Sequence, residues 1–130
     1  MRIFKTRTLA KFTRQNGISD LSLADAVERA RRGLIDADLG GRLIKQRVAR
    51  PGQGKRGGFR MLIGFGSDRA VFIFAFAKNE RENIGDAELV TLREIAGSFL
   101  NASTEKVAQA LNDGALIEVQ YGDEGKKDEG

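Results

Sequence analysis

The sequence predicts an α+β fold: a compact antiparallel sheet with two N-terminal helices and C-terminal helices packed on it. Apolar residues recur at helical spacing before residue 33 and after residue 86, whereas residues 42–77 show the alternating and continuous apolar patterns of strands. These strands are joined by short connections, which favours antiparallel pairing over a doubly wound parallel sheet. A chain of 130 residues fits one domain around a single core.

The first part of the chain predicts one strand and two helices. Residues 2–6 form the strand, and the helix after it ends at Gly17, because glycine adopts the left-handed conformation that closes many helices. The second helix begins at Ser19 or Ser22 and ends at Gly33. Its apolar residues share one face: Leu23, Ala26, Val27 and Ala30.

Three strands follow, over residues 42–49, 59–65 and 71–77. The third is apolar on both faces, so we expect it to be the central strand, with Phe74 inside the core. Replacing Phe74 by Ala should then cost about 3 to 5 kcal/mol. Residues 66–68 suit a hairpin connection between the second and third strands.

The last part of the chain returns to helical spacing. Asp86 is a candidate cap for a helix whose apolar stripe runs to Leu100. A final helix begins at Ser103 or Thr104 and ends at Gly114, and residues 115–119 form a closing strand or lie along the surface.

The expected domain covers residues 1–121, and residues 122–130 form a tail. The tail, GDEGKKDEG, has no apolar residue, so we expect it to be disordered. No apolar run approaches the roughly 20 residues that a membrane helix needs, and the N-terminus lacks the features of a signal peptide. The sequence therefore predicts a cytoplasmic protein that does not interact with membranes.

Positive charge is concentrated in the first half of the chain. Residues 1–60 carry a net charge of +10 and residues 61–130 a net charge of −6, and residues 42–60 contain seven Lys and Arg with no acid. Such a block predicts a surface that faces a polyanion, because neutralising phosphates releases counterions. The alternative is a solvated basic face that improves solubility.

Residues 47–60, RVARPGQGKRGGFR, place four glycines and a proline between two strands. Glycine lets backbone N–H groups approach a phosphate closely, so this segment is a candidate phosphate-binding loop. It is not a nucleotide-binding P-loop, because Ala49 and Arg56 stand where that motif needs Gly and Ser or Thr. It is not a Rossmann fingerprint either, because it leads into a strand. A flexible hairpin with incidental charge is the alternative.

Residues 78–83, KNEREN, directly follow the expected central strand, where a rigid base presents polar side chains. We expect Lys78 and Arg81 to close the same concave surface as the basic loop. Asn79, Glu80 and Asn83 are better explained as turn residues.

The two segments together fit phosphodiester cleavage without a metal or cofactor. The chain has no Cys and no His, which excludes disulfides, thiolate nucleophiles and the commonest metal ligands. In RNA the 2′-hydroxyl attacks the neighbouring phosphorus, and an arginine fork stabilises the charge that develops. A Lys whose pKa is lowered by burial or by other cations is the candidate for proton transfer.

The run RVARPGQGKRGGFRMLIGF, the later AKNERENI and the stretch LIDADLGG at residues 34–41 resemble the HigB-like branch of the RelE/ParE superfamily of toxins, over residues 1–119. The resemblance implies a RelE-like sheet flanked by two N-terminal helices and cleavage of mRNA on the ribosome, which inhibits translation. It also implies a cognate antitoxin, often a helix-turn-helix protein, and repression of promoter DNA through the toxin–antitoxin complex.

The resemblance also implies roles for individual residues. Arg60 matches the strand arginine that contacts the scissile phosphate. The resulting catalytic candidates are Arg60, Lys55, Lys78 and Arg81, and the RNA-binding candidates are Lys45, Arg47, Arg50 and Arg56. The chain departs from the family pattern because it has no His and its Tyr121 adjoins the tail. The alternative functions are a ParE-like gyrase inhibitor without enzymatic activity and a nucleic-acid-binding regulator.

Overall fold

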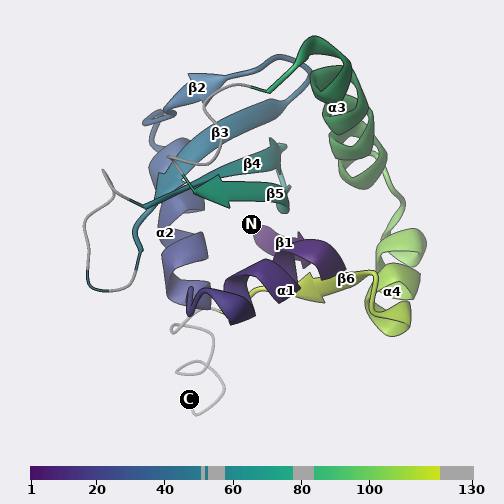
Figure 1. The fold of residues 1–130 in the computed structure, drawn as a ribbon. Coiled ribbons are helices and arrows are strands. Elements are labelled where there is room, and N and C mark those ends of the chain that lie inside the picture. The colour runs from purple at the N-terminus through teal and green to yellow at the C-terminus, as the bar shows by residue number, and fades with distance from the viewer. Residues whose placement is uncertain (51, 53–57, 78–83, 121–130) are drawn as a thin grey trace.

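A computed structural model of the protein describes residues 1–50, 52, 58–77 and 84–120 (Figure 1). Its elements in chain order are β1 (Arg2–Thr6), α1 (Arg7–Gln15), α2 (Asp20–Arg31), β2 (Ala37–Asp38), β3 (Leu43–Val48), β4 (Phe59–Phe65), β5 (Arg69–Ala77), α3 (Asp86–Leu100), α4 (Thr104–Asp113) and β6 (Leu116–Glu118). The predicted α+β class is confirmed.

Six strands form one sheet in the order β2-β3-β4-β5-β1-β6. The pairs are antiparallel except that β1 runs parallel to β5, with Arg2 opposite Arg69. Residues 115–119 contribute a closing strand, β6, which pairs with β1. The short β2 was not predicted, because two residues are too few to show an alternating pattern.

Helices cover both faces of the sheet (Figure 1). We call the face toward α1 and α2 the α2 face, and the face toward α3 and α4 the α3 face. The core on the α2 face includes Ile44, Val48, Phe59, Met61 and Phe72. The core on the α3 face includes Phe4, Leu43, Leu62, Val71 and Ala96. The odd-numbered residues Lys45 and Arg47 in β3, and the even-numbered Arg60 in β4, therefore belong to the α3 face.

Hydrogen bonds at the N-terminal ends of α2 and α3 show which residues begin these helices. Ser19 caps α2, because its Oγ accepts a hydrogen bond from the N–H of Ser22 at 3.2 Å. The predicted cap of α3 was wrong by one residue: Gly85 is the cap and Asp86 is the first helical residue. The Gly85 N–H donates a hydrogen bond to Oε1 of Glu88 at 3.2 Å, so the Glu88 side chain stabilises the start of α3.

An irregularity in β5 corrects the predicted burial of Phe74. Leu62 lies opposite Phe74, but the next residue, Ile63, lies opposite Phe72, so Ile73 is an extra residue in the ladder. Phe72 consequently packs on the α2 face and is fully buried. Phe74 packs on the α3 face and is only half-buried.

Two further expectations concern the ends of the chain and membranes. The predicted tail, residues 122–130, and Tyr121 lie outside the described residues. Within the described ranges, no helix has the length and apolar character needed to cross a membrane.

Candidate nucleic-acid interface

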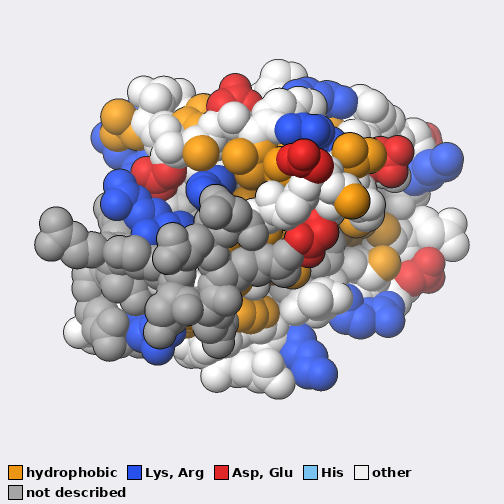
Figure 2. All heavy atoms as spheres, turned by 45° about the horizontal axis from the view of Figure 1, so that its top comes forward, with side chains coloured by type: hydrophobic (Ala, Val, Ile, Leu, Met, Phe, Trp, Pro, Cys, Tyr) orange, Lys and Arg blue, Asp and Glu red, His pale blue; other side chains and the backbone are white. Residues whose placement is uncertain are grey.

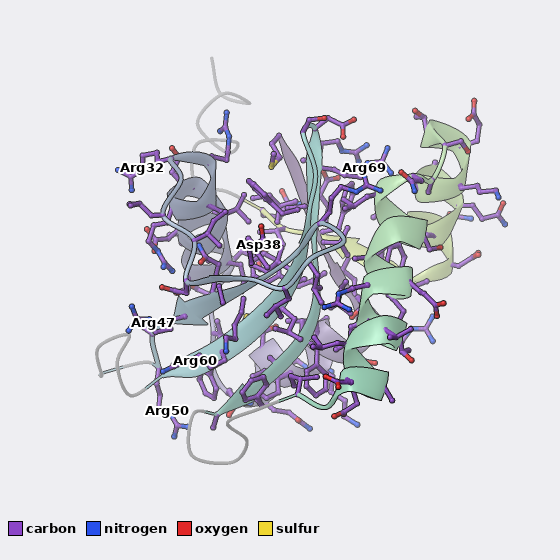
Figure 3. All side chains as sticks on the ribbon, turned by 90° about the horizontal axis from the view of Figure 1, so that it is seen from above. Arg32, Asp38, Arg47, Arg50, Arg60 and Arg69 are labelled. Carbon is purple, nitrogen blue, oxygen red and sulfur yellow. The ribbon has the colours of Figure 1, made fainter. Side chains whose placement is uncertain are left out.

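Four of the eight predicted site residues fall in the described part of the chain: Lys45, Arg47, Arg50 and Arg60. The other four, Lys55, Arg56, Lys78 and Arg81, lie outside the described residues. Figure 2 shows Lys and Arg side chains beside the grey residues, with an acidic side chain among them. Figure 3 places Arg47, Arg50 and Arg60 at one end of the sheet, away from Arg32 and Arg69.

Arg47 and Arg60 lie directly opposite each other on β3 and β4. The Arg47 N–H donates to the Asp36 carboxylate and its carbonyl accepts from the Arg29 side chain, so both backbone groups point away from β4. Arg47 and Arg60 are therefore a non-hydrogen-bonded pair, whose Cα atoms are typically about 4.5 Å apart and whose side chains lie close together. Like charges in this position destabilise a sheet. We call these two residues the arginine pair.

Arg60 has hydrogen-bonding capacity that the described residues do not use. Its Nη1 is buried and has no hydrogen-bond partner, and none of the ion pairs formed within the described ranges includes Arg60. A buried donor left unsatisfied costs about 1 to 3 kcal/mol. An anion that reaches the partly exposed Arg60 side chain would offset the repulsion from Arg47.

Apolar side chains lie next to the arginine pair on the same face. Phe76 is opposite Arg60 on β5, and the neighbouring row across the sheet is Lys45, Leu62 and Phe74. A hollow of about 330 Å³ lies between Phe74 and the first turns of α3, and its lining residues are Phe74, Ala87, Glu88, Thr91 and Leu92. The α3 face thus presents cations beside an apolar hollow.

Arg50 is placed differently from the arginine pair. Its Cζ lies 4.7 Å from the centre of the Phe59 ring, which belongs to the core on the α2 face. This is the arrangement of a cation–π contact. Its Nε is buried without a hydrogen-bond partner in the described part of the chain. The structure therefore groups Arg50 with the α2-face core and does not bring its guanidinium to Arg60.

Sequence reasoning missed two residues that contact Arg47. Asp36 and Arg29 bind both of its backbone groups, and Asp36 also forms an ion pair with its guanidinium, Oδ1 to Nη2, at 3.3 Å. Asp36 lies in the stretch LIDADLGG, which carries part of the family resemblance. The resemblance implied no role for the acidic residues of this stretch. No sequence pattern pointed to Arg29 as a partner of Arg47, because the two residues are distant in the chain.

Gly58 controls how closely the ends of β3 and β4 approach each other. A Cβ at this position would lie 2.2 Å from the Val48 carbonyl oxygen and 2.8 Å from the Arg50 nitrogen, both backbone atoms that cannot rotate away. Replacing Gly58 by Ala should push the strands apart two residues before Arg60. We expect the free energy of unfolding to fall by about 1 to 3 kcal/mol, measured by urea denaturation.

Gly97 provides the matched control for this prediction. It lies within α3, and a Cβ there would have no neighbour within 4 Å. Replacing Gly97 by Ala should raise the free energy of unfolding by about 0.5 to 1 kcal/mol, because alanine loses less backbone entropy in a helix. Equal effects of the two substitutions would show that the close approach at Gly58 is unimportant.

Other ionisable groups lie away from the arginine pair. Arg2 donates from Nε and Nη2 to Glu118, at 2.9 Å each, between β1 and β6. These hydrogen bonds raise the pKa of Arg2 above its ordinary value, against the opposing effect of burial. Among the residues that the structure describes, no three His, Cys, Asp or Glu side chains gather where they could hold a metal ion.

The fold and the arginine pair define a small, basic α+β protein with adjacent cations on one sheet face. A family model described as "RelE toxin of RelE / RelB toxin-antitoxin system" matches residues 1–119. Because this match covers most of the chain, the protein belongs to the RelE toxin family. It is therefore a toxin of a toxin–antitoxin system and has a cognate antitoxin as its partner. The comparison with curated proteins finds no match.

Proposed function

We propose that this toxin is a HigB-like endoribonuclease that cuts mRNA on the ribosome and thereby inhibits translation. The observation that carries the proposal is the arginine pair: two guanidinium groups on adjacent strands, one with a buried Nη1 that no described group satisfies. A scissile phosphodiester, flanked by further phosphates, is the anion that this arrangement suits. Membership of the RelE toxin family supports the same activity.

Arg60 stabilises the charge that develops when the 2′-oxygen attacks phosphorus. Its guanidinium matches two phosphate oxygens and stays charged throughout the reaction. Because Arg60 is partly buried, its interaction with a phosphate is stronger than it would be in water. Arg47 binds the same phosphate or its neighbour from the adjoining strand.

The remaining candidates complete the proposed interface. Lys55, Lys78 and Arg81 take part in proton transfer or charge stabilisation, and Lys45 and Arg56 bind RNA phosphates. The hollow beside Phe74 offers an apolar surface on which a nucleobase of the bound strand can stack. We also propose that the antitoxin is a helix-turn-helix protein and that the complex represses its own promoter.

The decisive experiment adds the purified toxin to ribosomes that carry a defined mRNA and maps the new 5′ ends. We expect cleavage within the codons occupied by ribosomes and little cleavage of the same mRNA without ribosomes. Adding the cognate antitoxin should abolish cleavage.

The alternatives predict different outcomes in the same system. A ParE-like inhibitor would leave the mRNA intact and block supercoiling by purified gyrase. A regulator would do neither and would bind a promoter fragment alone. Either result would overturn the proposed nuclease activity.

A further inference from the structure

We infer that Asp36 and Arg29 are positioning residues that hold Arg47 beside Arg60 during RNA cleavage. The inference rests on the proposed function and gives a role to two residues that the sequence analysis did not place at the site. Neither residue belongs to the arginine pair, and both act through Arg47.

The first support is that side chains replace a strand at the edge of β3. β2 pairs with β3 only through Ala37 and Asp38, so the ladder on that side ends before Arg47. The Arg47 N–H instead donates to Oδ2 of Asp36 at 2.7 Å, and the Arg47 carbonyl accepts from Nη2 of Arg29 at 2.6 Å. Both backbone groups of Arg47 are therefore fixed at a position that would otherwise be a frayed edge.

The second support is the contact with the Arg47 side chain. Oδ1 of Asp36 lies 3.3 Å from Nη2 of Arg47, while 47% of that side chain stays exposed. The carboxylate thus holds one side of the guanidinium, and the other N–H groups remain available to a phosphate. Its negative charge also offsets the repulsion within the arginine pair.

The third support is that the two positioning residues are themselves anchored. Gln46 is fully buried, and its Oε1 accepts from the Asp36 N–H at 2.8 Å. Its Nε2 donates to the carbonyls of Ala26 and Leu34 at 2.9 and 3.1 Å. Gln46 therefore ties Asp36 to α2 and to β3 together, which removes freedom that a loop residue normally has.

Arg29 is anchored from the helix side. Its side chain is 12% exposed and lies 3.1 Å from Asp25, one helical turn away, and 3.9 Å from Asp36. These two acids aim its guanidinium at the Arg47 carbonyl. The contact is a charge-assisted hydrogen bond, which is stronger than a bond between neutral groups.

The test compares Asp36→Ala and Asp36→Asn for cleavage of ribosome-bound mRNA. Misplacing Arg47 should lower kcat by roughly 10- to 100-fold in Asp36→Ala. KM should stay the same or fall, because a negative charge near the substrate phosphates is lost. Asp36→Asn keeps an oxygen that accepts from the Arg47 N–H and should recover most of kcat. A raised KM with unchanged kcat would overturn the inference.

A double-mutant cycle with Arg47→Ala separates positioning from a general structural effect. If Asp36 acts through Arg47, Asp36→Ala should lower kcat no further in the Arg47→Ala background. An equal loss in both backgrounds would overturn the inference. Glu28→Ala is the matched control, because Glu28 forms an exposed ion pair with Arg31 on the same helix, and it should leave kcat unchanged.

The failure of this inference is distinguishable from failure of the proposed function. If the wild-type toxin leaves ribosome-bound mRNA intact, the proposed function is wrong. If the wild type cuts mRNA and Arg47→Ala slows it, but Asp36→Ala does not, only the positioning role is wrong. If Arg47→Ala has no effect, the positioning role also fails, while a nuclease centred on Arg60 stands.

Discussion

Replacing Arg60 by Ala is expected to lower the rate of mRNA cleavage by about 10²- to 10³-fold and to abolish growth arrest on expression. Removing one preorganised donor from a charge-stabilising site has this scale of effect. Folding should be preserved, because no ion pair within the described residues depends on Arg60 and its loss relieves the repulsion from Arg47. The free energy of unfolding should therefore stay the same or rise slightly. Single-turnover cleavage and urea denaturation measure the two effects.

Two variants sharpen this prediction. Arg60→Lys keeps the charge but loses the planar fork, so its cleavage rate should lie between those of the wild type and Arg60→Ala. Arg32→Ala removes an exposed arginine at the C-terminal end of α2, away from Arg60 in Figure 3, and should cleave like the wild type. Wild-type cleavage by Arg60→Ala would remove this residue from the mechanism.

The largest effect on stability is expected for Phe72→Ala. Phe72 is fully buried in the core of the α2 face, on one of the two innermost strands. Truncating a buried phenylalanine costs about 3 to 5 kcal/mol, which is a large part of the 5 to 15 kcal/mol that typically stabilises a domain. The free energy of unfolding from urea denaturation measures the loss, and expression should give less soluble protein.

Phe74→Ala is the matched control for this substitution. It removes the same atoms two residues further along β5, from a side chain that is half-buried. Its cost should be clearly smaller, because less apolar surface is withdrawn from water at that position. A larger loss for Phe74→Ala would show that the α3 face, and not the α2 face, holds the more important core.

Much of this fold was predictable, because alternation along a strand depends only on local backbone geometry. Placing Phe59, Met61 and Ile63 on one face put Arg60 on the other, and the structure confirms that division. Helix boundaries were predictable to within a residue or two from Ser and Gly positions. The resemblance to the RelE/ParE superfamily over residues 1–119 agrees with the family to which the chain belongs, and its HigB-like branch stays a proposal.

Features that depend on distant partners were not predictable. The extra residue Ile73 moves Phe72 and Phe74 to opposite faces, although strict alternation would place them together. The partners of Arg47 come from α2 and from the loop before β2, so no spacing along the chain links them. The charge pattern showed only that Arg47 and Arg60 belong to one basic segment. The pairing of β3 with β4 places them directly opposite each other.

The position of β1 has a consequence for how the toxin is made. In the sequence this strand precedes the other five strands of the sheet, yet it lies between β5 and β6, and Phe4 pairs with Glu118 of β6. The sheet is complete only after β1 has paired with two strands that come much later in the sequence, and such distant pairings slow folding. A growing chain therefore cannot complete this sheet until β6 has left the ribosome, long after the first elements were synthesised.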